Sequence, residues 1–441
     1  MDSFLDNIYD VLERKTKKIK ELKLQQKLQI KVHPINNFNN INNFNHIELF
    51  KPGKFLPTTI YNEITTSTDY NKETHYRLPL HKPPNAPPNA PPNAPSNVPT
   101  HINIHLHGTE NAKRRVSKNI EDALICFMML YELSKRCNTR HYFEEIHIYL
   151  FLTPFKKSLP INQSFNQSSN HQLTTTLGAS HINSGLTLHH SDNGEILIYR
   201  EEEWFKLLLH ESIHLLGFDR HLIENNVNET TLMQYFHRSQ NINHNEGYTE
   251  LLAQILQCIY ISFKKGKTLF QRKKKWSKYI ELEKAHSMLQ IQKILKHMKI
   301  KPIDFLNNRS NTNNTNNTFT SNYKEETNVF SYYILKTILL YNLPSLFSTI
   351  IPYDLCITKE QTHRIPSFII TCFENKTNNL FRKHILDKSF IHSSSISKKK
   401  KRTISKKKSI SKKKKRTISK TKNHYYPFKS LRMAFHGPID L

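Results

Sequence analysis

Cysteine is scarce and scattered in this chain. The 441 residues include only five cysteines, and no two of them form a C-x-x-C pair. They are Cys126, Cys137, Cys258, Cys356 and Cys372. Small secreted domains that depend on disulfides carry a dense and even set instead. An odd, dispersed set in a long chain therefore predicts reduced thiols and an intracellular setting.

Segments that would direct the chain to a membrane are also missing. The first five residues lack the basic and apolar regions of a signal peptide. The most apolar run, residues 332–351, is interrupted by Lys336, Asn342 and Pro344, which is unsuitable for a transmembrane helix. We therefore expect no membrane partner and interpret the start of this run as a buried helix.

Acidic residues are few relative to basic ones. The chain has 36 Asp and Glu against 65 Lys and Arg, which gives a formal net charge of +29. Residues 398–422 hold 15 of the basic residues and no acidic one, within a segment in which residues 395–406 recur at 409–420. This stretch predicts salt-sensitive binding to nucleic acid or another polyanion, or a nuclear-localisation signal. Because no aromatic residues are interleaved with it, base stacking is not expected.

Low-complexity segments divide the chain. A Pro/Asn/Ala repeat begins at Pro83 and predicts an extended spacer, and residues 307–322 are nearly all Asn, Thr and Ser. Residues 4–32 have apolar positions at helical spacing and predict a basic surface helix. The predicted organisation is an N-terminal helix with an Asn-rich segment (1–80), a repeat linker (81–100), a main folded domain (101–300), an Asn/Thr-rich insertion (301–323), a helical part (324–390) and a disordered basic tail (391–441).

The most informative motif is His210-Glu211-Ser212-Ile213-His214. Residues four apart on a helix lie on one face, so His210 and His214 are candidate ligands of one zinc ion. Glu211 is placed to act as a general base without binding the metal. The flanking residues are almost all apolar, which predicts a buried helix whose polar groups need partners. Gly217 suits its C-terminal end.

A third ligand must come from further along the chain. His221 misses by one residue the spacing H-E-x-x-H-x-x-G-x-x-H, where Arg220 stands instead, and Asp219 is one residue too early. Glu246 and Glu250 are four apart on a second predicted helix, so both face the same way. Two carboxylates on an apolar helix are costly unless they serve a cation.

Together, His210-Glu211-x-x-His214 and Asn245-Glu246-Gly247-x-x-Glu250 resemble the gluzincin metallopeptidases, which include zinc aminopeptidases and thermolysin-like enzymes. The resemblance implies that Glu246 is the third ligand and that Glu250 orients a ligand histidine. Glu250, His221 and Asp219 stay open as alternative ligands, because the gap before Glu246 is longer than in those families. The Asn- and Lys-rich composition around this region resembles proteins of large DNA viruses of eukaryotes, for which a virus factory or virion is a further expected location.

The order of predicted elements also resembles the zincin N-terminal subdomain. Strands are predicted at residues 101–107, 145–152, 184–189 and 195–199, a helix at 120–137, and the motif helix from residue 202. The expected fold is therefore α+β and zincin-like, with a mixed sheet over the active-site helix and a helical C-terminal subdomain. By resemblance, an antiparallel edge strand pairs with the substrate backbone; the candidate residues are Gly185, Leu186, Thr187 and Leu188.

The function expected from these residues is zinc-dependent peptide hydrolysis with one Zn²⁺ and with Glu211 as general base. Candidate donors to the developing oxyanion are Tyr248, Tyr235 and His237. The alternative is a polyanion-binding protein whose zinc site is structural or vestigial. The basic stretch favours this alternative, whereas the carboxylate of Glu211 beside the ligands favours the enzyme.

Overall fold

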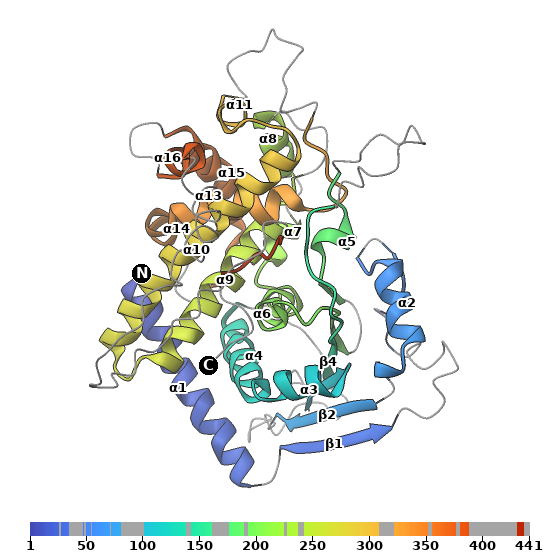
Figure 1. Cartoon of the computed structure of the whole chain (residues 1–441). Helices are drawn as coiled ribbons and strands as arrows, with labels where there is room; N and C mark the ends of the chain where they lie inside the picture. The colour runs from blue at the N-terminus through green and yellow to red at the C-terminus, as the bar shows by residue number, and fades with distance from the viewer. Residues whose placement is uncertain are drawn as a thin grey trace, which may run out of the picture.

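The structure is a computed structural model in which a six-stranded sheet packs against a layer of α-helices (Figure 1). It describes residues 1–25, 28–34, 47, 50–53, 55–70, 72–80, 101–137, 143–160, 176–188, 193–224, 227–236, 242–307, 322–351, 355–375, 380–387 and 430–435. The Pro/Asn/Ala repeat and the basic stretch 398–422 lie outside the described residues. Among the described helices, none is long and apolar enough to span a bilayer.

The sheet is mixed, as predicted, and its strand order is β1-β2-β3-β4-β6-β5. β3, β4 and β6 run parallel, while β1, β2 and β5 are each antiparallel to their neighbours. The strands are β1 (Gln29–Pro34), β2 (Lys72–Pro79), β3 (His101–His107), β4 (Glu145–Phe151), β5 (Gly185–Leu188) and β6 (Gly194–Ile198). β5 is therefore an antiparallel edge strand, at the position predicted for it. The sheet also includes β1 and β2, which precede the repeat linker and were not predicted.

Alternation of apolar residues explains the pairing of the central strands. Ile102 and Ile104 of β3 lie opposite Ile146 and Ile148 of β4 in a parallel register, and all four are buried. Residues two apart on a strand point to the same face. This row of β-branched side chains therefore fixes which face of the sheet meets the helical core.

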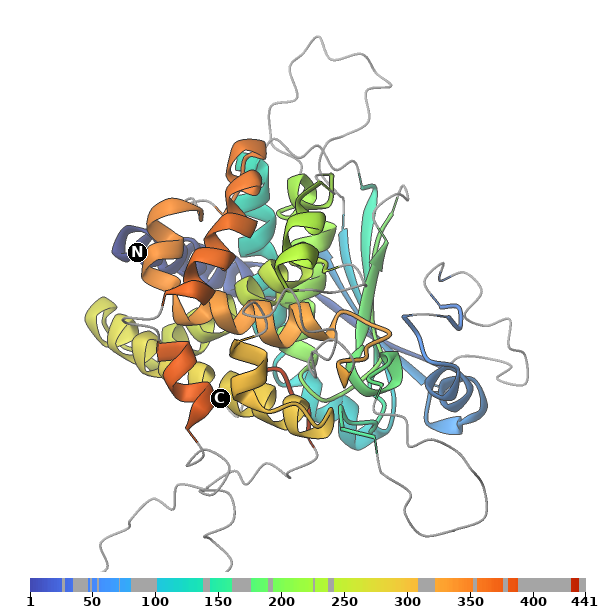
Figure 2. The same ribbon diagram turned by 90° about the horizontal axis from the view of Figure 1, so that it is seen from above.

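Helices cover the two faces of the sheet unequally (Figures 1 and 2). Most of them, α6 and α9 included, pack on one face, while α2 lies on the other over a smaller apolar cluster that includes Ile60, Ile64 and Phe151. The helices are α1 (Asp2–Leu24), α2 (Thr58–Thr66), α3 (Glu110–Ser117), α4 (Ile120–Ser134), α5 (Ala179–Ile182), α6 (Trp204–Leu215), α7 (Arg220–Glu224), α8 (Val227–Tyr235), α9 (His244–Lys265), α10 (Leu269–His297), α11 (Pro302–Leu306), η4 (Phe330–Leu335, a π-helix), α13 (Lys336–Tyr341), α14 (Leu343–Thr349), α15 (Lys359–Glu374) and α16 (Leu380–Leu386), with short 3₁₀ turns η2 (Thr68–Tyr70) and η3 (Lys135–Cys137).

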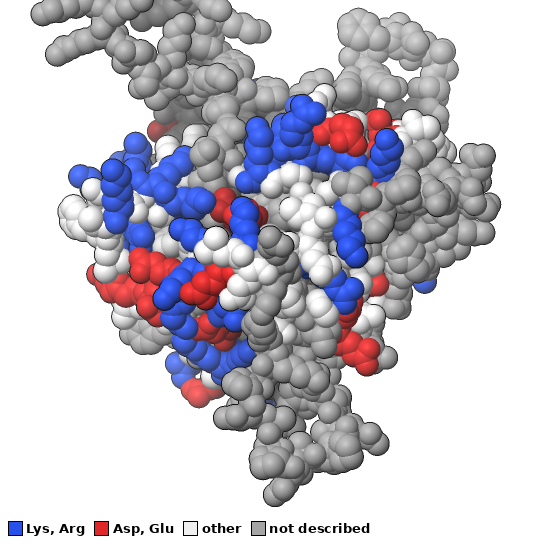
Figure 3. Space-filling view, turned by 90° about the horizontal axis from the view of Figure 1, so that it is seen from below, with Lys and Arg blue, Asp and Glu red and all other residues white. Residues whose placement is uncertain are grey.

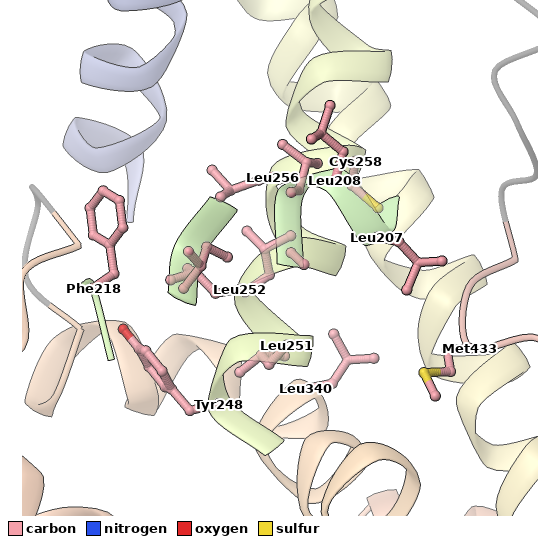
Figure 4. Close-up of a cluster of buried hydrophobic side chains, with 14 of the residues drawn as sticks. Leu207, Leu208, Phe218, Tyr248, Leu251, Leu252, Leu256, Cys258, Leu340 and Met433 are labelled. Atoms are coloured by element: carbon pink, nitrogen blue, oxygen red, sulfur yellow. The ribbon is translucent and has the colours of Figure 1, made fainter. Parts of the chain in front are cut away.

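The centre of the helical layer is the contact between α6 and α9. Leu207 and Leu208 of α6 belong to the same buried cluster as Leu251 and Leu252 of α9 (Figure 4). Every residue of α6 is buried. Close packing of this kind restricts side chains to few rotamers, so the polar groups that these helices carry are held in fixed positions.

Two expectations from the sequence require correction. α1 is not a surface helix, because its apolar stripe, with Phe4, Leu5 and Ile8, is buried in the main core. The cysteines are not all reduced thiols, because Cys137 and Cys356 form a disulfide. The other three cysteines are free and buried.

The prediction that residues 391–441 form a disordered tail is wrong for the segment 430–435. Residues 430–435 are described, and Leu431, Met433 and Ala434 are buried in the folded body.

The face of the molecule in Figure 3 carries basic and acidic side chains side by side. Ion pairs such as Lys273–Asp6 and Arg14–Glu132 join α1 to α10 and α4. Surface pairs of this kind contribute little stability individually.

Candidate metal centre

The two motif histidines lie on one face of the buried helix α6. His210 and His214 are 5% and 7% exposed, and their Nε2 atoms lie 3.1 Å apart. The i, i+4 spacing places one ring a turn above the other. The end of the helix follows from Gly217, which has φ +70° and carries the chain into a reversed turn closed by the bond from Phe218 N to Ile213 O.

Helix α9 brings Glu246 to the same point. Its Oε2 lies 3.4 Å from Nε2 of His210 and 3.5 Å from Nε2 of His214. Within the described part of the chain, these three residues are the group of His, Cys, Asp or Glu whose ligand atoms are close enough to hold a metal ion. Two imidazole nitrogens and one carboxylate oxygen form a donor set that suits zinc. The same Oε2 is buried and accepts no hydrogen bond from the described residues, as expected of an atom that faces a cation.

Each motif histidine has a second carboxylate beside its far nitrogen, and for His214 this contact is a hydrogen bond. Nδ1 of His214 lies 2.6 Å from Oδ2 of Asp219, and Nδ1 of His210 lies 3.2 Å from Oε2 of Glu250. Glu250 also accepts two hydrogen bonds from Nζ of Lys206, at 2.6 and 2.7 Å. A carboxylate at Nδ1 fixes the tautomer and turns Nε2 toward a metal.

Charge in this buried site shifts the proton affinities of its groups. Burial alone would lower the pKa of His214, but Asp219 and Glu246 outweigh burial and raise that pKa well above its usual value. Burial would likewise raise the pKa of Glu246, but the nearby His214 and His210 hold it well below its usual range. Glu246 therefore stays ionised, which a zinc ligand requires.

The side chain of Glu211 lies between α6 and the edge strand. The hydroxyl of Thr187 in β5 donates to Oε2 of Glu211 at 2.7 Å. Gly185 faces the same carboxylate, and a Cβ atom at this position would lie only 2.9 Å from Oε1. A larger residue at this position would therefore displace the carboxylate of Glu211. The predicted base and the predicted edge strand are in direct contact.

A small cavity adjoins these groups. Its volume is about 30 Å³, and its lining includes Gly185, His210, Glu211, Tyr332 and Met433. A larger cavity of about 700 Å³ lies at the C-terminal end of α10, near Lys299 and Ile385, and contains none of the site residues. Of the three candidate metal ligands, His210 is the one among the residues that line the small cavity, where it lies beside Glu211.

Tyr332 is a site residue that the sequence did not reveal. It lies on the π-helix η4, its ring centroid is 6.0 Å from that of His210, and it lines the small cavity. Burial, with Glu246 and Glu211 nearby, raises the pKa of its phenol well above the usual value. The hydroxyl therefore keeps its proton and can donate a hydrogen bond. No local motif marks this position, which is 86 residues beyond Glu246.

The tyrosines predicted as oxyanion donors lie elsewhere. Tyr248 is fully buried within the apolar cluster near Phe218 (Figure 4), because it is two residues from Glu246 on α9 and faces the opposite side. Tyr235 packs against Phe236 and Phe373. Neither lines the small cavity. His237 lies outside the described residues.

The alternative third ligands are also placed away from the ligand position. His221 is 39% exposed at its side chain and lies beside Glu224. Asp219 contacts the Nδ1 side of His214, not the side that faces His210 and Glu246. Glu250 contacts the Nδ1 side of His210 in the same way. The geometry therefore favours Glu246 over all three as the third ligand.

The site must be interpreted from its own geometry, because comparison with protein-family models, curated proteins and solved structures found no match for this chain.

Proposed function

We propose that this protein is a zinc-dependent peptidase with a gluzincin-type site on a zincin-like fold. The observation that carries the proposal is the position of Glu211. This carboxylate follows a candidate metal ligand directly in the sequence and is fixed by Thr187 against an open strand edge. A structural metal site has no need of a free carboxylate beside its ligands.

His210, His214 and Glu246 would hold the metal. Zinc bound by these groups supplies Lewis acidity, which makes water more acidic and polarises a carbonyl group. Asp219 would keep the imidazole of His214 in the tautomer that offers Nε2, and the carboxylate of Glu250, 3.2 Å from Nδ1 of His210, would favour the same tautomer there. The ligand set therefore has both the donors and the supporting carboxylates that zinc chemistry needs.

Glu211 would act as the general base and then as the general acid. It takes a proton from the attacking water, and it gives that proton to the amine that leaves when the peptide bond breaks. Thr187 holds one carboxylate oxygen, which leaves Oε1, on the side of Gly185, to accept the proton. The phenol of Tyr332, which lines the same cavity, would donate a hydrogen bond that stabilises the negative charge on the carbonyl oxygen.

β5 would align the substrate. Its outer edge is unpaired within the described sheet, so an extended peptide can add as a further strand by main-chain hydrogen bonds. The scissile bond would then pass close to Glu211, because Gly185 and Thr187 of this strand both contact that side chain.

The direct test is to incubate the zinc-loaded protein with a peptide library and to identify the products by mass spectrometry. We expect cleavage at defined positions that a zinc chelator abolishes and added zinc restores. Cleavage that persists at full rate in the chelator would contradict the proposal.

A polyanion-binding role of the basic stretch is a second candidate, supported by the 15 Lys and Arg without an acid in residues 398–422. It is compatible with the peptidase and separable from it. Deleting residues 395–422 should abolish retention on DNA at low salt while peptide cleavage persists. Retention that survives the deletion would assign polyanion binding to another part of the chain.

A further inference from the structure

Residues 430–435, which we term the C-terminal strap, are bonded to the interior through their backbone. Four amide groups of the strap donate hydrogen bonds to residues outside it, and three of these bonds go to the buried carboxylates of Glu203 and Glu283. The bonds run from Leu431 N to Lys157 O (3.0 Å), Met433 N to Glu203 Oε2 (3.1 Å), Ala434 N to Glu203 Oε1 (2.7 Å) and Phe435 N to Glu283 Oε2 (2.8 Å). Loss of the strap would therefore leave buried charges without these partners.

The carbonyl groups of the strap are bonded just as fully. Four consecutive carbonyls accept hydrogen bonds from side chains of α9, α10, η4 and α13. The bonds run to Ser430 O from Lys293 (2.9 Å), to Leu431 O from Tyr333 (2.5 Å), to Arg432 O from His286 (3.0 Å), and to Met433 O from Lys336 (3.2 Å) and Gln254 (3.3 Å). With donors and acceptors both satisfied, the strap is a fixed part of the fold.

Met433 points from this strap into the candidate site. Its side chain lies beside that of Leu207 (Figure 4), and both residues line the small cavity with His210 and Glu211. Its sulfur accepts a contact of 3.6 Å from Nζ of Lys206, the residue that binds Glu250. The strap thus reaches the site from the far end of the chain, beyond the basic stretch.

We propose that Met433 is the floor of a substrate pocket and restricts the peptide residue beside the scissile bond to a small side chain, such as that of Gly, Ala or Ser. The inference rests on the proposed function for the identity of the ligand. Its basis is size: a cavity of about 30 Å³ beside Glu211 has room for about one water-sized group. The flexible Met side chain fills the depth that a larger substrate side chain would occupy.

The binding of two hydroxamates of different size to the metal-loaded protein tests whether Met433 limits the size of the side chain that the pocket accepts. Acetohydroxamate carries only a methyl group, whereas phenylalanine hydroxamate carries a bulky side chain. M433A removes most of the floor, and M433L is the matched control that keeps its volume without the sulfur. We expect M433A to bind phenylalanine hydroxamate at least ~10-fold more tightly than the wild type and M433L do, since each methylene removed from a pocket changes discrimination by about 10-fold or more. Affinity for acetohydroxamate should change little. Equal affinity of M433A and wild type for the bulky probe would overturn the inference.

A thiol probe separates this inference from the proposed function, because it needs no metal. In M433C, the new thiol should react with methyl methanethiosulfonate at least about 10-fold faster than the buried thiols of the wild type, since thiol reactivity follows access. A folded M433C that reacts no faster than the wild type would show that residue 433 does not line an accessible pocket. A fast reaction in a protein that binds no zinc would leave the pocket in place and refute the peptidase.

Discussion

The carboxylate of Asp219 lies 2.6 Å from Nδ1 of His214, and this contact depends on the turn that follows the motif helix. Gly217 adopts a positive φ and reverses the chain, so that the residue two positions later reaches back beneath the histidine. Thr249 of α9 also contacts the same oxygen at 3.4 Å. The turn, the carboxylate and the ligand therefore form one unit.

Removing either supporting charge should weaken the metal site without abolishing it. We expect D219N and E250Q each to lower zinc affinity by about 10- to 100-fold, the usual cost of losing a group that orients a ligand. Competition with a chromophoric chelator measures the Kd. Unchanged affinity in both variants would show that these carboxylates do not support the ligands.

Removing the third ligand should have a larger effect. E246A should leave the purified protein without stoichiometric zinc, because two histidines alone do not complete a structural or catalytic zinc site. H221A serves as the control and should retain its zinc, since His221 lies beside Glu224 away from the ligand cluster. Elemental analysis of both proteins decides the point. Zinc loss in H221A combined with full occupancy in E246A would reverse the ligand assignment.

Tyr332 should contribute to turnover and not to metal binding. Y332F removes one hydroxyl from the lining of the cavity, and we expect kcat to fall by about 10²- to 10³-fold, as for other lost oxyanion donors. KM and zinc content should stay close to the wild-type values. A matched variant, Y248F, alters a tyrosine buried in the apolar cluster and should leave kcat within a few-fold. A similar loss of kcat in both variants would mean that Tyr332 acts only through the fold.

His286 should make the fold sensitive to acid. Burial lowers the pKa of this histidine to about 3, although its bond to Arg432 O opposes the shift. The unfolded chain takes up the proton near pH 6.5 and the folded chain does not, so the unfolded state binds more protons between the two values. The free energy of unfolding should therefore decrease by about 1.4 kcal/mol per pH unit from this group alone as the pH falls below 6.5.

Chemical denaturation at a series of pH values measures this dependence. H286Q keeps a hydrogen-bond donor without the titration, so its stability should change less steeply with pH between 6 and 4.5. An identical slope in wild type and H286Q would assign the acid sensitivity to other groups.

Alternation of apolar residues and the four-residue spacing of polar ones predicted individual strands and helices of this protein correctly. β3 begins and ends where the alternation of His101 to His107 predicted it. The HExxH helix and the helix that carries Glu246 and Glu250, α9, were both expected. Their side chains converge because each helix presents residues four apart on one face. Helix geometry alone left Glu246 and Glu250 both open as the third ligand, and the resemblance to gluzincins is what implied Glu246.

Contacts between distant segments could not be predicted in the same way. β2 has only Tyr76 and Leu78 buried, so its apolar signal is too weak to mark a strand. Cys137 and Cys356 are separated by 219 residues, and nothing in their spacing indicates a pair. Met433 follows a basic stretch that resembles an independent tail, yet main-chain bonds to buried carboxylates hold it in the site. These contacts depend on tertiary structure that a single sequence does not reveal.

The central claim is that Glu211 performs proton transfer beside a bound zinc ion. E211Q preserves the shape of the side chain, and the Thr187 hydroxyl can still donate to its amide oxygen, but the amide cannot take up a proton. The direct measurement is zinc content together with kcat/KM on a cleaved peptide, for E211Q and wild type prepared in parallel. We expect about one zinc per chain in both proteins and at least a ~100-fold lower kcat/KM in E211Q. Equal kcat/KM at equal zinc content would contradict the account.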